Sequence, residues 1–97
     1  MRRVTLDRYV CETLMADLVG HDRAPSAFLV YLHLAAQGGR SVTTSHADMA
    51  EATGLSKSGV QAAIRLLKRR QLIQSRTEST TAIPTYRVLA PWRRRSS

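Results

Sequence analysis

Apolar side chains recur at helical spacing in several stretches of the chain. The most regular pattern lies in residues 56–70, where apolar residues fall at positions i, i+3, i+4 and i+7: Val60, Ala63, Ile64 and Leu67. This spacing predicts a single apolar stripe along a helix. The other side of that helix carries Lys57, Ser58, Gln61, Ala62, Arg65, Lys68 and Arg69. The pattern therefore predicts a surface helix with an apolar back and a basic front.

Another helix is expected directly before this one, between Ser45 and Gly54. Ser45 is a suitable N-cap, and one side of the helix carries Met49, Ala50 and Thr53. Gly54 supplies the positive φ that ends a helix, Leu55 is expected to be buried in the turn, and Ser56 caps the next helix. Two helices joined by so short a turn predict a helix-turn-helix over residues 45–70.

Residues 4–19 predict a first helix, with Thr5 as its cap and Asp7 in its first turn. Its apolar residues recur every four positions, and three more widen the stripe: Leu6, Val10, Leu14 and Leu18, then Tyr9, Met15 and Val19. So broad a face is expected either to pack wholly inside the domain or to be shared with a second copy. The helix 4–19 is therefore our candidate for a homodimer interface.

A second helix is expected to open at Pro25 and Ser26 and to end at Gly38 and Gly39. We predict a core stripe made of Phe28, Leu29, Leu32, Ala35 and Ala36. Further apolar residues, Val30, Tyr31 and Leu34, make this helix apolar nearly all round. Such a helix is usually central in a small domain.

Three short stretches favour strands: residues 40–44, 71–75 and 86–89. In the last of them, Tyr86 and Val88 are expected on one face and Arg87 on the other. The predicted order is α-α-β-α-α-β-β, a mainly α fold with a small β-hairpin (α+β). We assign residues 1–90 to one domain and residues 91–97 to a basic flexible tail, in which Trp92 is expected to dock back on the domain rather than to stack on bases.

Charge divides the chain into two unequal parts. The net charge of +8 is the sum of −1 over residues 1–55, with five basic and six acidic groups, and +9 over residues 56–97, with ten basic groups and one acidic. All the positive excess therefore begins at the predicted basic helix. A basic surface kept for solubility would explain the total but not this division, so we expect a face that binds a polyanion.

Several classes of function find no support in the sequence. A single cysteine, Cys11, excludes an internal disulfide and fits a reducing cytosol. The histidines are scattered, no catalytic arrangement or phosphate-binding glycine loop is recognisable, and no apolar run approaches the roughly 18 residues of a membrane span. We therefore expect neither an enzyme nor a membrane protein, with no metal, no cofactor and no evident small-molecule ligand. The expected location is the cytoplasm, in association with the nucleoid.

The string M-A-E-A-T-G-L-S-K-S-G-V, residues 49–60, resembles the helix-turn-helix of bacterial winged-helix regulators of the GntR and MarR types. The match is carried by Ala50, Gly54, Leu55 and Val60. Gly59 departs from it, since the resemblance leads us to expect Thr or a similar residue there. The predicted order of elements is the winged-helix arrangement, which extends the resemblance over roughly residues 25–89. It implies a regulator of transcription that binds double-stranded DNA, more simply a repressor than an activator.

Candidate DNA contacts follow from placing helix 56–70 in a major groove. The base-reading candidates are Lys57, Ser58, Gln61 and Arg65. Gln61 is suited to adenine, and Lys57 or Arg65 to guanine. The candidates for the DNA backbone or the minor groove are Thr44, Ser45, Ser56, Lys68, Arg69, Arg70, Arg76, Arg87, Arg93, Arg94 and Arg95.

Two other functions remain open from the sequence. The same fold could serve replication initiation or partition of a plasmid or phage, in which case repeated binding sites at an origin are expected. It could also be a winged-helix protein–protein interaction module, in which the basic face docks an acidic partner. An ordinary helical hairpin would explain the periodicity of residues 45–70, but not the division of charge.

Overall fold

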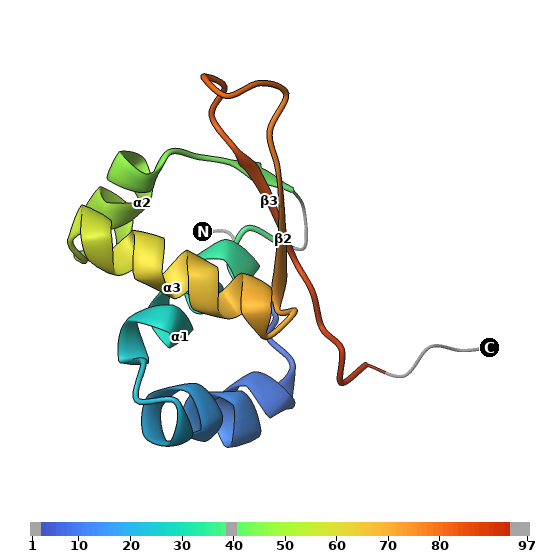
Figure 1. Ribbon diagram of the computed structural model, residues 1–97. Helices are drawn as coiled ribbons and strands as arrows, with labels where there is room; N and C mark the ends of the chain where they lie inside the picture. The colour runs from blue at the N-terminus through green and yellow to red at the C-terminus, as the bar shows by residue number, and fades with distance from the viewer. Residues whose placement is uncertain (1–2, 39–40, 94–97) are drawn as a thin grey trace.

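The computed structural model describes residues 3–38 and 41–93 (Figure 1). Residues 8–21 are helical and include two π-helical segments, η1 (Val10–Leu14) and η2 (Asp17–His21). The remaining elements are α1 (Pro25–Ala35), β1 (Val42–Thr43), α2 (His46–Thr53), α3 (Lys57–Arg69), β2 (Ile73–Arg76) and β3 (Thr85–Val88). This is the predicted order of helices and strands in a small α+β domain. Over the described residues, no helix has the length and apolar character needed to cross a membrane.

The first helix begins at Arg8 rather than at residue 4, and Thr5 does not cap it. Its buried residues are Val10, Leu14 and Leu18, spaced by four. In a regular α-helix such a series drifts by about 40° at each step, because a turn contains 3.6 residues. The π-type bonds, from Met15 N–H to Val10 O and from Asp22 N–H to Asp17 O, widen the turns and offset this drift.

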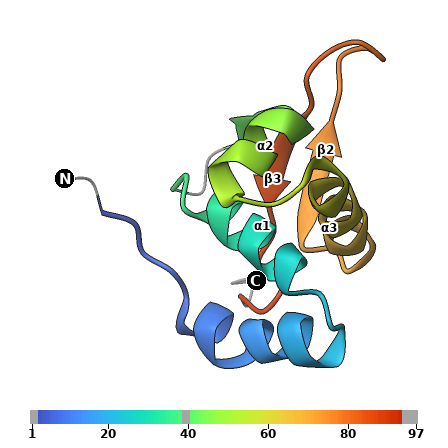
Figure 2. The ribbon, with the colours of Figure 1, turned by 90° about the vertical axis from the view of Figure 1, so that its left-hand side faces the viewer.

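Of the rest of the predicted stripe, Leu6 precedes the helix and is half-buried, and the other three residues lie at the surface. Tyr9, Met15 and Val19 keep 39%, 40% and 39% of their surface exposed. Of the two outcomes expected for this broad apolar face, complete burial is therefore wrong. Figures 1 and 2 both place the first helix at the opposite end of the domain from the loop that joins β2 and β3.

Helix α1 is central, as predicted, because it packs against the first helix, α2, α3 and β3. Its buried residues are Ala27, Phe28, Val30, Tyr31 and Leu34. The predicted stripe was wrong at Leu29, which is 43% exposed, and at Ala36, which lies in the turn after the helix. A helix that is apolar nearly all round does not itself specify its buried side, and the neighbouring elements decide it. Burial raises the pKa of Tyr31 to about 12, and its hydroxyl donates a hydrogen bond to the Leu89 carbonyl at 3.0 Å.

The three strands form an antiparallel sheet in the order β1-β3-β2. Tyr86 of β3 is buried and Arg87 is exposed, which confirms the predicted alternation. The first strand is shorter than predicted, and Arg40 lies outside the described residues. The second begins at Ile73 instead of Gln71, because Gln71 adopts a φ of +58° in the turn after α3.

Polar contacts hold both ends of the first helix. At its start, the Asp7 carboxylate accepts hydrogen bonds from Trp92 Nε1 at 2.9 Å and Arg93 Nε at 2.6 Å. The Trp92 ring also stacks on Tyr9, with 4.6 Å between centroids, so Trp92 docks on the domain as expected. At the other end, Arg70 binds Asp17 at 2.5 Å and also binds Asp22.

The contacts of Asp22 predict a pH dependence of stability. The hydrogen bond with His21 and the nearby Arg70 charge hold the pKa of Asp22 below its usual range. A lowered folded-state pKa stabilises the fold above the unfolded pKa of about 3.9, and this stabilisation is lost as pH falls through the folded-state value. Asp22→Asn should therefore lower the Tm near neutral pH and flatten its decline in acid, as measured by thermal unfolding between pH 7 and pH 2.

A matched control for this experiment is Glu51→Gln, an exposed carboxylate on α2 for which no ion pair is formed within the described residues. In Glu51→Gln, the decline of the Tm with falling pH should be the same as in the wild type. Identical slopes for Asp22→Asn and the wild type would refute the assigned role of Asp22.

Candidate nucleic-acid interface

The helix-turn-helix is organised by two caps and one glycine. The N–H of Asp48 donates to Ser45 Oγ at 3.0 Å, and the N–H of Gly59 donates to Ser56 Oγ at 3.0 Å. Gly54 adopts a φ of +79°, which ends α2 and is strained for any residue with a Cβ. The predicted caps and the predicted turn are confirmed. Leu55, expected to be buried, is half-buried.

The apolar back of α3 is enclosed as predicted, with Val60, Ala63, Ile64 and Leu67 all buried. Helix α3 packs through this side on α1, α2 and β2. Figures 1 and 2 show no other element over its outer side. The rotation of α3 about its axis is therefore fixed, and its front is open to a partner.

The front of α3 carries most of the predicted base-reading residues. Lys57, Ser58 and Arg65 are exposed, while Gln61 is half-buried. Lys68 and Arg69, both exposed, continue the basic surface to the end of the helix. No acidic residue lies within α3, so nothing on the helix itself neutralises this front.

Two arginines of the sheet lie on its outer face. Arg76 is paired with Thr85 and Arg87 with Gln74, so Arg76 and Arg87 are diagonal neighbours across β2 and β3. Both are exposed, on the side opposite to buried Tyr86. The polar residues at the start of α2, Thr44 and Ser45, are half-buried, and Ser56 is exposed beside the start of α3.

Other predicted backbone contacts are already engaged within the protein. The Arg70 guanidinium binds Asp17 and Asp22, and Arg93 binds Asp7 through two nitrogens at 2.6 and 3.0 Å. Arg94 and Arg95 lie outside the described residues. Sequence reasoning missed these ion pairs because their partners are 48 or more positions apart.

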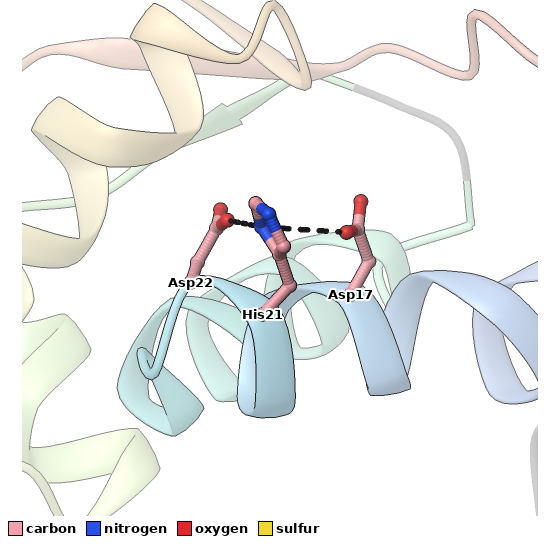
Figure 3. Close-up of side chains that lie close together, drawn as sticks. All are labelled: Asp17, His21 and Asp22. Atoms are coloured by element: carbon pink, nitrogen blue, oxygen red, sulfur yellow. Dashed lines mark hydrogen bonds and ion pairs between the residues drawn. The ribbon is translucent and has the colours of Figure 1, made fainter.

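Asp17, His21 and Asp22 bring three potential metal ligands within 4.8 Å of one another (Figure 3). His21 Nδ1 lies 2.8 Å from Asp22 Oδ1 and 3.9 Å from Asp17 Oδ1. The Arg70 guanidinium already supplies the positive charge that these carboxylates need. The cluster is thus explained as an ion-pair network that joins the first helix to the end of α3.

One feature of the interface has no counterpart in the sequence prediction. Ile83, in the loop between β2 and β3, is 54% exposed, more than any other large apolar side chain described. It borders a shallow cavity of about 240 Å³ whose other walls are Ser45, His46, Ala47, Lys57, Ala82 and Pro84. Three segments distant in sequence form this cavity, so no local pattern could have revealed it.

The Ser56 cap predicts an energetic coupling with Gly59. A Cβ at Gly59 would lie 3.0 Å from Ser56 Oγ, which is too close without movement of the cap. Gly59→Ala should raise the free energy of unfolding by less than the ~1 kcal/mol by which Ala stabilises a helix over Gly. The substitution Ser56→Ala should itself lower the free energy of unfolding by about 1 kcal/mol. In that background, Gly59→Ala should raise the free energy of unfolding by more than it does in the wild type. Urea unfolding of the four proteins would measure the coupling.

Gly20→Ala provides the matched control, because nothing lies within 4 Å of a Cβ built at that helical glycine. Its effect on the free energy of unfolding should be the same with Ser56 or Ala at position 56. An equal gain for Gly59→Ala in both backgrounds would contradict the steric account of Gly59.

Three elements contribute side chains to this surface. The helix α3 presents a basic front, the sheet adds Arg76 and Arg87, and the loop adds an apolar residue beside Lys57.

Comparisons of the chain with models of known protein families, with curated proteins and with solved structures find no match.

Proposed function

We propose that this protein binds double-stranded DNA sequence-specifically as a winged helix-turn-helix regulator of transcription, with α3 in the major groove. The observation that carries the proposal is α3 itself, a helix with a buried apolar back and an uncovered basic front. The sheet order β1-β3-β2, with β2 and β3 as the wing, is compatible with the proposal. So is the charge of +9 over residues 56–97.

Within this proposal the side chains of α3 take different roles. Arg65 and Lys57 are exposed and suited to guanine, whereas half-buried Gln61 would reach adenine with only its amide end. Lys68 and Arg69, near the end of the helix, are suited to phosphates. Arg76 and Arg87 would contact the backbone or the minor groove from the wing. Arg70 is left out of the set, because Asp17 and Asp22 hold its guanidinium.

We further propose that two copies associate through the first helix. Its exposed face carries Tyr9, Met15 and Val19, which belong to different turns of the same helix. It lies at the opposite end of the domain from the wing, so pairing would leave the wing free (Figure 2). A dimer would bind a site with two-fold symmetry and would enlarge the roughly 600–1,000 Å² interface of a single module.

Selection of bound sequences from a random duplex pool would test the function directly. We expect enrichment of one motif, arranged as a palindrome if the protein is a repressor that binds as a dimer. The selected motif can then be located in natural DNA. Repeated copies of it at a replication origin would instead favour the replication or partition function. Absence of any enriched motif would refute the DNA-reading proposal and favour a protein-binding module.

Substitution on α3 should distinguish base contacts from phosphate contacts. Arg65→Ala should cost about 1–3 kcal/mol of binding free energy on the selected site and relax the preference at one base pair. Lys68→Ala, the matched control, should weaken binding evenly for all sequences and reduce the salt slope by about 0.9. Fluorescence anisotropy with single-base variants of the site would measure both. An even loss for Arg65→Ala would demote it to a phosphate contact.

Substitution on the first helix should change the oligomeric state. In sedimentation equilibrium, the wild type should have twice the mass of one 10.8 kDa chain. Met15→Asp should have the mass of a monomer, because dimerisation would bury a carboxylate in the apolar interface. Leu29→Asp introduces the same charge at an exposed site on α1 and should leave the dimer intact. A monomeric wild type, or a dimeric Met15→Asp variant, would refute this interface.

A further inference from the structure

The cavity beside Ile83 is an apolar site within an otherwise polar and basic surface. Its walls come from the first turn of α2, from Lys57 at the start of α3 and from residues 82–84 of the wing loop. Ala47, Ala82, Ile83 and Pro84 supply apolar surface, and no acidic residue is among the lining residues. An apolar side chain as exposed as Ile83 costs free energy in water, and a partner that covers it would recover that cost.

The walls of this cavity are held in place by the fold. Tyr86 of β3 is buried, and its hydroxyl lies 3.2 Å from Nε2 of His46, the first residue of α2. The N–H of Thr44 donates to the Pro84 carbonyl at 3.2 Å, which fixes the end of the wing loop against the chain before α2. These contacts tie the start of α2 to the end of the wing loop, so the cavity is formed in the free protein.

The chemistry around the cavity restricts what can fill it. Lys57, one of its walls, is also a candidate to read a guanine edge, so a ligand in the cavity would lie next to a base contact. The apolar group that duplex DNA presents beside base edges in the major groove is the C5-methyl of thymine. Apolar walls from Ala47, Ile83 and Pro84 suit a methyl group on a base next to the one that Lys57 reads.

Building on the function proposed above, we propose that this cavity receives the C5-methyl group of a thymine, with Ile83 as the specificity-determining contact. Covering one methyl group should be worth about fourfold in affinity, the equivalent of roughly 0.8 kcal/mol. The thymine is expected within one or two base pairs of the base that Lys57 reads. Selectivity at this position would then come from shape instead of hydrogen bonding.

The test uses the full-length protein and its selected duplex. Each thymine is replaced in turn by deoxyuracil, which removes only the methyl group and keeps base pairing. At one thymine per half-site, wild-type affinity should fall about fourfold. For Ile83→Ala, binding to the thymine and deoxyuracil duplexes should be equal at that position. Leu29→Ala, which truncates another exposed apolar residue, should keep the wild-type ratio.

Each other outcome decides against the site or against the function. The deciding quantity is the ratio of the affinity for the thymine duplex to that for the deoxyuracil duplex. A ratio near one at every thymine, or an unchanged ratio in Ile83→Ala, overturns the methyl contact while leaving DNA binding established. A selected motif without thymine next to the base read by Lys57 does the same. Weaker binding of Ile83→Ala to all duplexes alike would assign Ile83 to sugars or to a minor-groove wedge instead. Failure to select any sequence would overturn the proposed function itself, and the methyl contact with it.

Discussion

Burial of one side of α3 is the constraint on which the rest of the structure depends. Val60 and Leu67 are completely enclosed, and full burial of such a side chain is worth roughly 2 kcal/mol. Rotation of the helix would expose that stripe and close the positions that now face outwards. The orientation of Lys57, Arg65 and Lys68 therefore follows from the packing of the opposite face, and these three residues need no contacts of their own to hold it.

The charges of the chain serve two purposes that its sequence does not separate. Part of the excess positive charge after residue 56 is neutralised internally, because Asp7 binds Arg93 while Asp17 and Asp22 bind Arg70. Partly exposed pairs of this kind contribute little stability individually. They do determine position, since they attach both ends of the first helix to residues that follow α3. Among the described residues after residue 56, the exposed cations outside these ion pairs lie on α3 and on the outer face of the sheet.

Local features could be predicted from the sequence, and features that depend on distant partners could not. Caps and turns need only the neighbouring backbone. The residue types at Ser45, Gly54 and Ser56 therefore predict them directly. The start of the first helix was predicted too early because the Asp7 carboxylate binds Trp92 and Arg93 instead of the free N–H groups of the first turn. The buried side of α1 was misassigned because that helix is apolar nearly all round. The cavity at Ile83 joins three segments, and no periodicity encodes it.

In the proposed complex, affinity and selectivity would come from different parts of one surface. Long cationic side chains such as Lys68, Arg76 and Arg87 can follow phosphates on any sequence, so they add affinity without choosing a site. Selectivity requires groups whose positions are fixed before binding, since a mobile side chain adapts to alternatives. Two parts of the surface meet this requirement. The hydrogen bond from Gly59 N–H to Ser56 Oγ fixes the start of α3, and the bond from Thr44 N–H to the Pro84 carbonyl fixes the backbone beside Ile83. The bases next to Lys57 are therefore where discrimination between sequences should be strongest.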